Sequence, residues 1–553
     1  MSRADLVILN GRVLTMDPER PRAEALAVAQ GRILALGDRA EIEALAAPGA
    51  RRLDAQGGTV LPGMTEAHLH LFPGAYGLRL LQLPGVVETA ELIPRLRDYA
   101  EANPDEGLLI CKAAEYGLFP EGGPPPRAVI DAAVADRPVL LIGGDHHTAW
   151  ANTIALERAG LLHGRRTPPG AEVTMGRDGR ANGALLEHPA YDPVLALRTS
   201  GGREMLGLAG TEPQGLTPAQ RAEDLAVLEE GLRHCASYGF TSLHNMDGNL
   251  YQLDLLAELE REGRLICRTE VPFHLTPEKP LATLQIATEM HEAYRSGRLR
   301  SGRVKIFMDG VIDSGTALLV DDYADRPGWR GEPLHDAVRF EDACVEADRR
   351  GLQISVHAIG DGAVRRVLDG FAAAQAANGR RDSRHRIEHI ELLHPEDRPR
   401  IKALGAVASM QPPHVPGGPD FPEEPWKSKV GPARWDAAFP VRTLREDGVP
   451  MVFASDWPVS PLDPMRGVKA AMTRARWGAG LPDQRSTLME ALHGYTAGGA
   501  YAGFDEGRLG RLAPGRPADV AVMDRDLEAL APEAIDQARA AVTLLEGQPI
   551  HEA

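Results

Sequence analysis

The sequence has little cysteine and no long apolar run. Its four cysteines among 553 residues, Cys111, Cys235, Cys267 and Cys344, lie far apart and form no C-x-x-C pair. This spacing argues against a disulfide framework and favours a reduced, cytoplasmic protein in which Cys267 and Cys344 are buried thiols. No segment approaches the ~18 apolar residues of a membrane span. The N-terminal segment lacks the apolar stretch of a signal peptide.

Positive charge is in the minority. The chain has 78 acidic and 61 basic residues, which gives a formal net charge of −17. This balance argues against a nucleic-acid partner or an acidic membrane surface. We therefore expect a soluble acidic protein. The length allows roughly two to four structural units with ample core.

Lysine is scarce, which draws attention to Lys305. Only seven of the 61 basic residues are lysines, and Lys305 is second in the apolar segment 304–308. A lysine in a buried strand is costly unless it is paired or chemically altered. Desolvation lowers the pKa of the amine, and the neutral amine could add carbon dioxide to give a carbamate that bridges two metal ions. An ion pair with Asp309 or Asp313 explains the same position, and spacing alone leaves both explanations open.

Two histidines end the apolar segment 59–70, in the sequence His68-Leu-His70. On a strand, residues two apart point to the same side. Two neutral imidazoles at a strand end form half of a metal site, and imidazole suits zinc and similar divalent ions. The pair alone is weak evidence, because surface histidines also show this spacing.

Later strand-like segments end in further groups that can bind a metal. Four such segments follow in the chain: 304–310, 352–361, 386–389 and 451–456. Each is a short apolar run, as expected of a strand buried on both faces. The step from His357 to His389 fits one strand plus one helix, so we predict successive units of an α/β (β/α)8 TIM-like barrel. In such barrels catalytic groups lie at the C-terminal ends of the strands, and Asp456 ends the last of these segments.

The remaining segments suggest a composite organisation. The chain ends, 1–57 and 510–553, show short strands and turns, and neither end can bury a core alone, so we expect them to form one small β-sandwich domain. The barrel is expected over 58–72 and 221–509. Residues 73–220 are then a large insertion after the first barrel strand, which we interpret as a lid or substrate-recognition subdomain.

Several short motifs extend this pattern along the chain. They are Pro62-Gly63 before His68, then 305–310, 314–317, 356–361, 387–389, 409–412, 455–459 and 515–519. Their order resembles the amidohydrolase superfamily of metal-dependent hydrolases, most closely its YtcJ-like branch, which includes N-substituted formamide deformylase. The resemblance covers nearly the whole chain, and the motifs are specific only in combination.

The resemblance implies a site for two divalent metal ions, expected to be zinc. The implied ligands are His68, His70 and Asp456 for one ion, His357 and His389 for the other, and carboxylated Lys305 as the bridge. It thereby favours the carbamate over the ion pair, and it also implies a homodimer. The sequence departs from the family at Glu66, where an aspartate is usual. The extra methylene shifts any hydrogen bond toward the ligand imidazoles.

The implied site predicts hydrolysis. A divalent metal lowers the pKa of bound water toward ~7 and polarises a carbonyl. Asp456 is the candidate general base, which later returns the proton to the leaving nitrogen. We expect cleavage of a C–N bond other than a peptide bond, in a small amide, N-formyl or N-acyl compound. A lactone or ester hydrolase, or a deaminase, would use the same metals. A non-catalytic regulatory protein on this scaffold is a further alternative.

Other residues are candidates for substrate binding. They are His146, His147, His244, His414 and Trp457. The first two precede a motif at 149–152 and could donate a hydrogen bond to the substrate. For each histidine a packing role remains an alternative, and Trp457 is expected to shape an apolar pocket rather than take part in chemistry.

Overall fold

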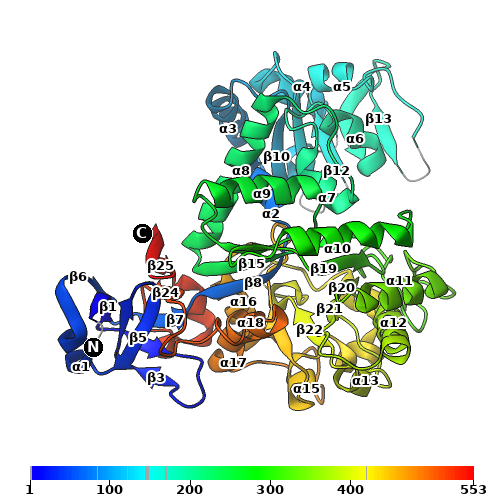
Figure 1. Ribbon diagram of the computed structural model, residues 1–553. Coiled ribbons are helices and arrows are strands. Elements are labelled where there is room, and N and C mark those ends of the chain that lie inside the picture. Colours follow the sequence, from blue (N-terminus) through cyan, green and yellow to red (C-terminus); the bar gives the residue numbers. More distant parts are fainter. Residues whose placement is uncertain (1–2, 84, 121, 144–147, 168–170, 419) are drawn as a thin grey trace. The chain divides into compact units, whose positions relative to one another are not determined.

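Two compact units make up the chain. The computed structural model describes residues 3–553 except 84, 121, 144–147, 168–170 and 419, and Figure 1 shows its elements. The first unit comprises Met1–Ala75, Gly207–Gln214 and Leu225–Ala553. The second comprises Tyr76–Leu206 and Gly215–Asp224.

Parallel strands dominate the centre of the first unit. They are β8 (Met64–Leu69), β15 (Phe240–Asn245), β16 (Arg268–Glu270), β17 (Phe273–His274), β18 (Leu299–Arg300), β19 (Arg303–Phe307), β20 (Gln353–Ala358), β21 (Arg386–His389), β22 (Val407–Met410) and β23 (Met451–Phe453). They pair in the orders β18-β16-β15-β8 and β17-β19-β20-β21-β22-β23. Every residue of β8, β15 and β20 is buried. Burial on both faces explains the apolar runs in the sequence.

Helices alternate with these strands. They are α8 (Pro218–Ser237), α9 (Leu250–Arg261), α10 (Leu284–Ala293), α11 (Ala337–Arg349), α12 (Asp361–Asn378), α13 (Arg398–Ala403), α14 (Trp426–Val430), α15 (Val441–Glu446), α16 (Pro464–Thr473), α17 (Leu488–Tyr495) and α18 (Ala497–Ala502). In Figure 1, α11 and α12 lie together outside β20. The side-chain amide of Asn249 starts α9 by accepting a hydrogen bond from Gln252 N. This alternation of parallel strands and helices confirms the predicted α/β class.

The two chain ends share a sheet. One sheet has the order β5-β4-β1-β6, from β1 (Ala4–Leu9), β4 (Ala25–Ala29), β5 (Arg32–Gly37) and β6 (Ala46–Asp54), with α1 (Arg39–Leu45) beside it. The other has the order β26-β25-β24-β7-β2-β3, from β2 (Arg12–Leu14), β3 (Arg22–Ala23), β7 (Thr59–Pro62), β24 (Val520–Met523), β25 (Ala540–Leu545) and β26 (Gln548–Glu552). Ile8 of the first sheet and Val60 and Val522 of the second belong to one hydrophobic cluster. Neither chain end alone supplies that cluster.

A six-stranded sheet forms the second unit. Its order is β13-β14-β12-β11-β10-β9, from β9 (Leu81–Gln82), β10 (Leu109–Ala114), β11 (Val139–Gly143), β12 (Thr148–Ala151), β13 (Glu172–Met175) and β14 (Ala181–Leu186). Its helices include α3 (Thr89–Ala102), α4 (Pro126–Ala133), α5 (Thr153–Arg158) and α6 (His188–Leu195). Ile110 and Leu140 belong to one hydrophobic cluster, while Leu109 and Leu141 belong to another. Successive residues therefore face different cores, as expected of a sheet covered on both sides.

The second unit differs in extent from the insertion expected over 73–220. Residues 207–214 belong to the first unit. Gly207 O lies 3.2 Å from His274 Nδ1, and Thr211 O accepts a hydrogen bond from Asn249 Nδ2 at 2.7 Å. These backbone contacts, which a sequence pattern does not reveal, attach the segment to β17 and α9. The role of the insertion in substrate recognition stays a prediction.

Two expectations about chemistry concern the whole chain. All four cysteines are buried and none forms a disulfide, so Cys267 and Cys344 are buried thiols as predicted. Within the described ranges, no helix combines the length and apolar character needed to cross a membrane.

Candidate metal centre

The first ligand cluster forms where β8 and β23 end. His68 lies in β8, His70 immediately follows it, and Asp456 lies shortly after β23. Nε2 of His68 and Nε2 of His70 are each 3.3 Å from Asp456 Oδ1. The backbone holds this arrangement, because Asp456 N donates to His68 O at 2.9 Å and His70 N donates to Trp457 O at 2.7 Å. Three predicted ligands thus converge on one point.

A second cluster adjoins the first. The rings of His357, in β20, and His389, at the end of β21, have centroids 4.5 Å apart, and His389 is 5.0 Å from His68. His414 stacks on His389 at 6.0 Å. Ligand atoms of His389, His414 and Asp456 lie within 4.8 Å of one another, as do those of the His68, His70 and Asp456 group. His414, expected as a substrate contact, therefore competes with His357 for the role of ligand.

Lys305 is fully buried beside these groups. Its Nζ has no hydrogen-bond partner among the residues that the structure describes, and it lies 4.5 Å from the centre of the Phe307 ring. Burial lowers the pKa of Lys305 to about 8. Asp309 instead lies 3.2 Å from His357 Nδ1, and it accepts hydrogen bonds from the backbone of Ile359 and Gly360. The described residues therefore do not pair Lys305 with Asp309.

Carboxylates orient two of the predicted ligands, His68 and His70. Glu388 Oε2 is 2.8 Å from His68 Nδ1, and Asp247 Oδ1 is 3.1 Å from His70 Nδ1. A carboxylate at Nδ1 fixes the proton there and leaves Nε2 free to bind a metal. Sequence reasoning missed Asp247 and Glu388 as orienting groups. Their signal was their position: Glu388 directly precedes His389, and Asp247 follows the strand that ends near His244.

Burial and charge set the protonation of the cluster. Burial lowers the pKa of His68 to about 4, which keeps its imidazole neutral. Burial opposes protonation of His70 too, but hydrogen bonds with Asp247 and Asp456 raise its pKa to about 9. Burial alone would raise the pKa of Asp456, yet the nearby His68 and His70 hold that pKa well below its usual range. Asp456 is thus an anion at the centre of the histidines.

The hydrogen bonds of Glu66 go to backbone groups rather than to the imidazoles that its extra methylene was expected to affect. Its Oε1 accepts hydrogen bonds from Ser455 N at 2.9 Å and from His68 N at 3.4 Å. Oε2 has no partner in the described structure. Burial raises the pKa of Glu66 to about 8. Glu66 therefore joins the backbone of β8 to the segment that carries Asp456.

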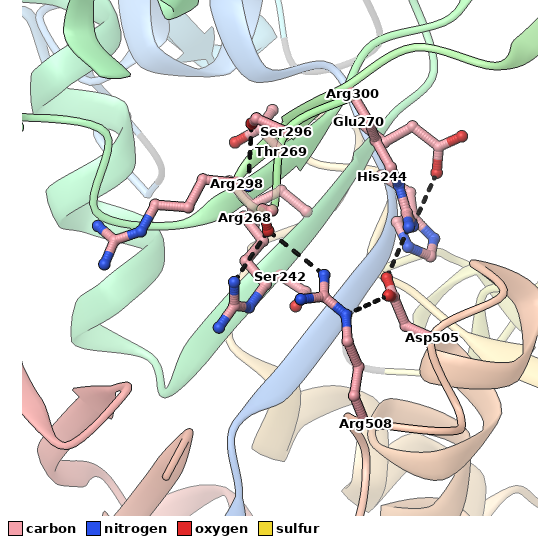
Figure 2. Close-up of a pocket in the computed structure, with 12 residues that line it drawn as sticks. Ser242, His244, Arg268, Thr269, Glu270, Ser296, Arg298, Arg300, Asp505 and Arg508 are labelled. Atoms are coloured by element: carbon pink, nitrogen blue, oxygen red, sulfur yellow. Dashed lines mark hydrogen bonds and ion pairs between the residues drawn. The ribbon is translucent and has the colours of Figure 1, made fainter. Parts of the chain in front are cut away.

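His244 lies away from this convergence and lines a separate small pocket, shown in Figure 2. The pocket holds about 20 Å³, room for little more than one water molecule. Figure 2 shows Arg300 beside two carboxylates; the ion-pair distances are 3.4 Å to Glu270 and 2.7 Å to Asp505. His244 Nδ1 is 3.2 Å from Arg386 Nη1. The other arginines of the lining are paired as well: Arg268 and Arg298 with Glu546, and Arg508 with Asp505.

Arg386 links that pocket to the ligand cluster. It is fully buried and lies 3.0 Å from Glu388 Oε2, while its Nη2 also donates to Ser409 Oγ and to Ala67 O, both at 2.7 Å. Glu388 in turn holds His68. The buried ion pair of Arg386 and Glu388 thus holds the carboxylate that contacts His68.

The remaining predicted contacts are less central. The Trp457 ring packs against His234 of α8, with centroids 5.4 Å apart. Gly74, in α2 (Leu71–Gly77), lies against the same indole, where a Cβ would come within 2.4 Å of it. His146 and His147 lie outside the described residues. Trp457 therefore packs against α2 and α8, and its expected role in shaping an apolar pocket stays a prediction.

Comparison with known proteins gives a consistent result. A protein-family model described as "Amidohydrolase family" matches residues 51–551. The Arabidopsis thaliana protein LONG AFTER FAR-RED 3 is 29% identical over 94% of this chain and 87% of its own length. N-substituted formamide deformylase of Arthrobacter pascens is 26% identical over 94% of each chain.

A solved structure adds the fold. An uncharacterized metal-dependent hydrolase from Pyrococcus furiosus has a TM-score of 0.73 and 27% identity, over 96% of this chain and 99% of that chain. Its similarity agrees with a TIM-barrel-like arrangement of the parallel strands described above. The family match spans nearly the whole chain, so this protein belongs to the amidohydrolase family.

Proposed function

We propose that this protein hydrolyses a C–N bond of a small amide, N-formyl or N-acyl compound at a centre for two divalent metal ions. The proposed ligands are His68, His70, carboxylated Lys305, His357, His389 and Asp456. One observation carries the proposal: Nε2 of His68 and of His70 both lie 3.3 Å from Asp456 Oδ1. Two imidazoles and a carboxylate at one point are a ligand set that zinc prefers.

Unpartnered buried atoms support the fit of metal ions. Within the described chain, both ring nitrogens of His389 and the Nζ of Lys305 lack hydrogen-bond partners. Buried polar atoms without partners are unfavourable unless a ligand satisfies them. The unpartnered Nζ of Lys305, whose pKa burial lowers to about 8, is suited to carboxylation, in which a neutral amine and carbon dioxide give a carbamate anion and one proton. The anion would sit among imidazoles instead of an unpaired ammonium group.

The side chains divide the chemical work. When bound, the metal supplies a water of lowered pKa and polarises a substrate carbonyl. Asp456, held as an anion, accepts the proton from the attacking water and returns it to the leaving nitrogen. Asp247 and Glu388 keep the proton of each imidazole on Nδ1, so that His70 and His68 present Nε2 to the centre. Burial of the cluster strengthens these interactions.

The proposed substrate class is inferred from the proteins that this chain resembles. N-substituted formamide deformylase aligns with almost the whole chain, which supports an amide with a small acyl group. Ester or lactone hydrolysis and deamination are alternatives at the same centre, because fold and ligands do not choose the substrate. A non-catalytic role is disfavoured, since every ligand position is filled and the side chains converge.

We also propose that the strand series closes into a (β/α)8 barrel and that the two sheets of the chain ends form a β-sandwich. Supporting the first, Leu69 forms a parallel bridge with Trp457, which links the end of β8 to the segment after β23. Supporting the second, both sheets contribute to one hydrophobic cluster. Closure would place the ligands of different strands around one axis.

A substrate panel with matched variants tests the function. We would supply zinc and assay N-substituted formamides, N-acyl amino acids, lactones and aminopurines with wild type, His70→Ala and the control His163→Ala. His163 is an exposed histidine of the second unit. The proposal predicts amide turnover in wild type and control and its loss in His70→Ala. Ester or lactone turnover without amide turnover would overturn the proposed substrate class, and activity in His70→Ala with unchanged metal content would overturn the centre.

A further inference from the structure

His274 is a buried histidine that the proposed mechanism does not use. It ends the short strand β17, and its register partner in the neighbouring parallel strand β19 is Lys305. Paired residues of adjacent parallel strands place their side chains on the same face of the sheet. The imidazole of His274 therefore lies on the face that carries Lys305.

The ring of Phe307 links His274 to the metal centre. Its centroid is 5.3 Å from that of His274 and 5.2 Å from that of His357. Lys305 Nζ lies 4.5 Å from the same centroid. His274 is only 4% exposed. The imidazole thus borders on the metal centre without being one of the proposed ligands.

The hydrogen bond of His274 fixes the position of its ring proton. Nδ1 lies 3.2 Å from Gly207 O, and a backbone carbonyl oxygen can only accept a hydrogen bond. Nδ1 therefore carries a proton. A second ring proton would create a buried cation whose hydrogen bond, within the described chain, goes to an uncharged carbonyl, and this is unfavourable. Nε2 is thus left with a lone pair.

Gly207 is fixed by the residues around His70. A Cβ at Gly207 would clash with Asp247 Oδ2 and with Gln252 Nε2. Asp247 is also the carboxylate that contacts His70 Nδ1. The close approach therefore requires glycine, and it places the carbonyl that orients His274 beside the carboxylate that orients His70.

Nε2 of His274 is an unused hydrogen-bond acceptor. Among the residues that the structure describes, it has no hydrogen-bond partner. The two nitrogens lie on different edges of the ring, so Nε2 faces away from Gly207. His274 belongs to neither group of convergent ligand atoms found in the described chain, which favours a donor from the substrate over a metal ion. Buried polar atoms without partners are unfavourable unless a ligand satisfies them.

We propose that His274 is a substrate-binding residue whose Nε2 accepts a hydrogen bond from the N–H group of the scissile amide. This inference rests on the proposed function and narrows its substrate class to amides that retain a hydrogen on nitrogen. N-monosubstituted amides satisfy Nε2. Esters, lactones and N,N-disubstituted amides leave it buried without a donor, which strongly disfavours them at a site built around that hydrogen bond.

Calorimetry on the zinc-loaded full chain tests the N–H contact independently of turnover. The probes are N-butylmethanesulfonamide and methyl pentyl sulfone, which differ only by an N–H group in place of a methylene. Neither has a carbonyl carbon that water can attack. We expect wild type to bind the sulfonamide roughly 10–100-fold more tightly than the sulfone.

The variant His274→Phe keeps a ring beside Phe307 but lacks Nε2, so it should bind the two probes with similar affinities. His291→Phe is the matched control. The Nδ1 of His291 also contacts a backbone carbonyl, Ser301 O at 2.7 Å, but this exposed histidine belongs to α10. The control should keep the preference of wild type for the sulfonamide.

Several results would overturn the proposal. They are equal affinities of wild type for the two probes, no binding of either probe, or an undiminished preference in His274→Phe. His274→Gln retains an acceptor and should keep part of the preference. Loss of both probes from both variants would make His274 a packing residue and would also overturn the proposal. Circular dichroism establishes that each variant is folded.

The outcome separates this inference from the proposed function. A sulfonamide preference that depends on His274, without amide turnover in the substrate panel, would support the N–H contact and overturn the proposed hydrolysis. Amide turnover without such a preference would overturn the role of His274 alone.

Discussion

Replacement of Asp247 by asparagine tests how the chain prepares His70 for metal binding. Asp247 is fully buried, with Oδ1 3.1 Å from His70 Nδ1. Its Oδ2 accepts a hydrogen bond from Gln252 Nε2 at 2.8 Å. Asparagine keeps the size of the side chain but removes its charge, and its amide group places a donor against one of these two donors. We expect His70 to become a less basic and less firmly held ligand.

The change in metal affinity caused by Asp247→Asn depends on pH, because the substitution has two opposing effects. Loss of an orienting carboxylate lowers metal affinity roughly 10–100-fold, or about 1–3 kcal/mol. With a pKa of about 9, His70 is protonated near neutrality, so metal binding at pH 7 must displace a proton at a cost of about 3 kcal/mol. Asp247→Asn lowers that pKa and hence that cost. The affinity difference should therefore be small at pH 7 and reach its full size above pH 9.

The raised pKa of His70 also determines how the stability of the metal-free protein changes with pH. The protonated His70 contributes stability that is fully present below the ordinary histidine pKa of 6.5. That contribution is lost as the pH rises through about 9. Asp247→Asn should therefore destabilise the metal-free protein more at low pH than at high pH.

Zinc competition against a chromophoric chelator, at pH 7 and at about pH 9.5, measures the effect. Asp342→Asn, at an exposed position of α11, is the matched control and should bind zinc like wild type. Equal zinc affinities of wild type and Asp247→Asn at the higher pH would refute the reasoning. So would a larger loss at pH 7 than at the higher pH.

Three further predictions concern stability and ligand assignment. The buried carboxylate of Asp348 accepts hydrogen bonds from four side chains. These bonds outweigh burial and keep its pKa below the ordinary value, so its contribution is lost as the pH falls. Urea unfolding of Asp348→Asn should show a loss of about 3 kcal/mol near neutral pH and a weaker acid dependence than wild type, whereas parallel pH profiles would contradict this. Arg386→Met leaves Glu388 buried without its cation and should destabilise the protein by about 3–5 kcal/mol in urea unfolding, and an unchanged midpoint would contradict this. Elemental analysis should show metal loss in His357→Ala but not in His414→Ala, and the reverse would make His414 the ligand.

The sequence placed metal-capable side chains at the ends of strands, and the resemblance to the amidohydrolase superfamily assigned them as ligands. His68 and His70 lie two residues apart at the end of a fully buried strand, and His357 and His389 end successive parallel strands. In a parallel sheet such positions meet at one edge, which is why these side chains could be expected to converge. Lys305 could also be singled out from the sequence. Lysine is scarce in this chain, and a cation within an apolar strand needs an explanation.

The sequence did not reveal which side chains and segments contact one another in the folded protein. The sequence offered Asp309 as a partner for Lys305, but the structure places it 3.2 Å from His357 Nδ1. His414 stacks on His389, where the 3-10 helix Pro412–His414 after β22 brings it, and its expected contact with substrate stays a prediction. The attachment of residues 207–214 to the first unit depends on backbone contacts that leave no pattern in the sequence. Each of these depends on long-range packing rather than on local spacing.

The central claim is that Lys305 bridges a pair of metal ions. Elemental analysis of metal per chain, in protein purified without chelator, tests it most directly, with Lys305→Ala as the variant and Lys402→Ala, an exposed lysine, as the control. We predict about two metal ions in wild type and in the control and fewer in Lys305→Ala, because the bridge requires the carbamate. About one metal ion in all three proteins would contradict the claim and leave Lys305 as a buried structural lysine beside a mononuclear centre.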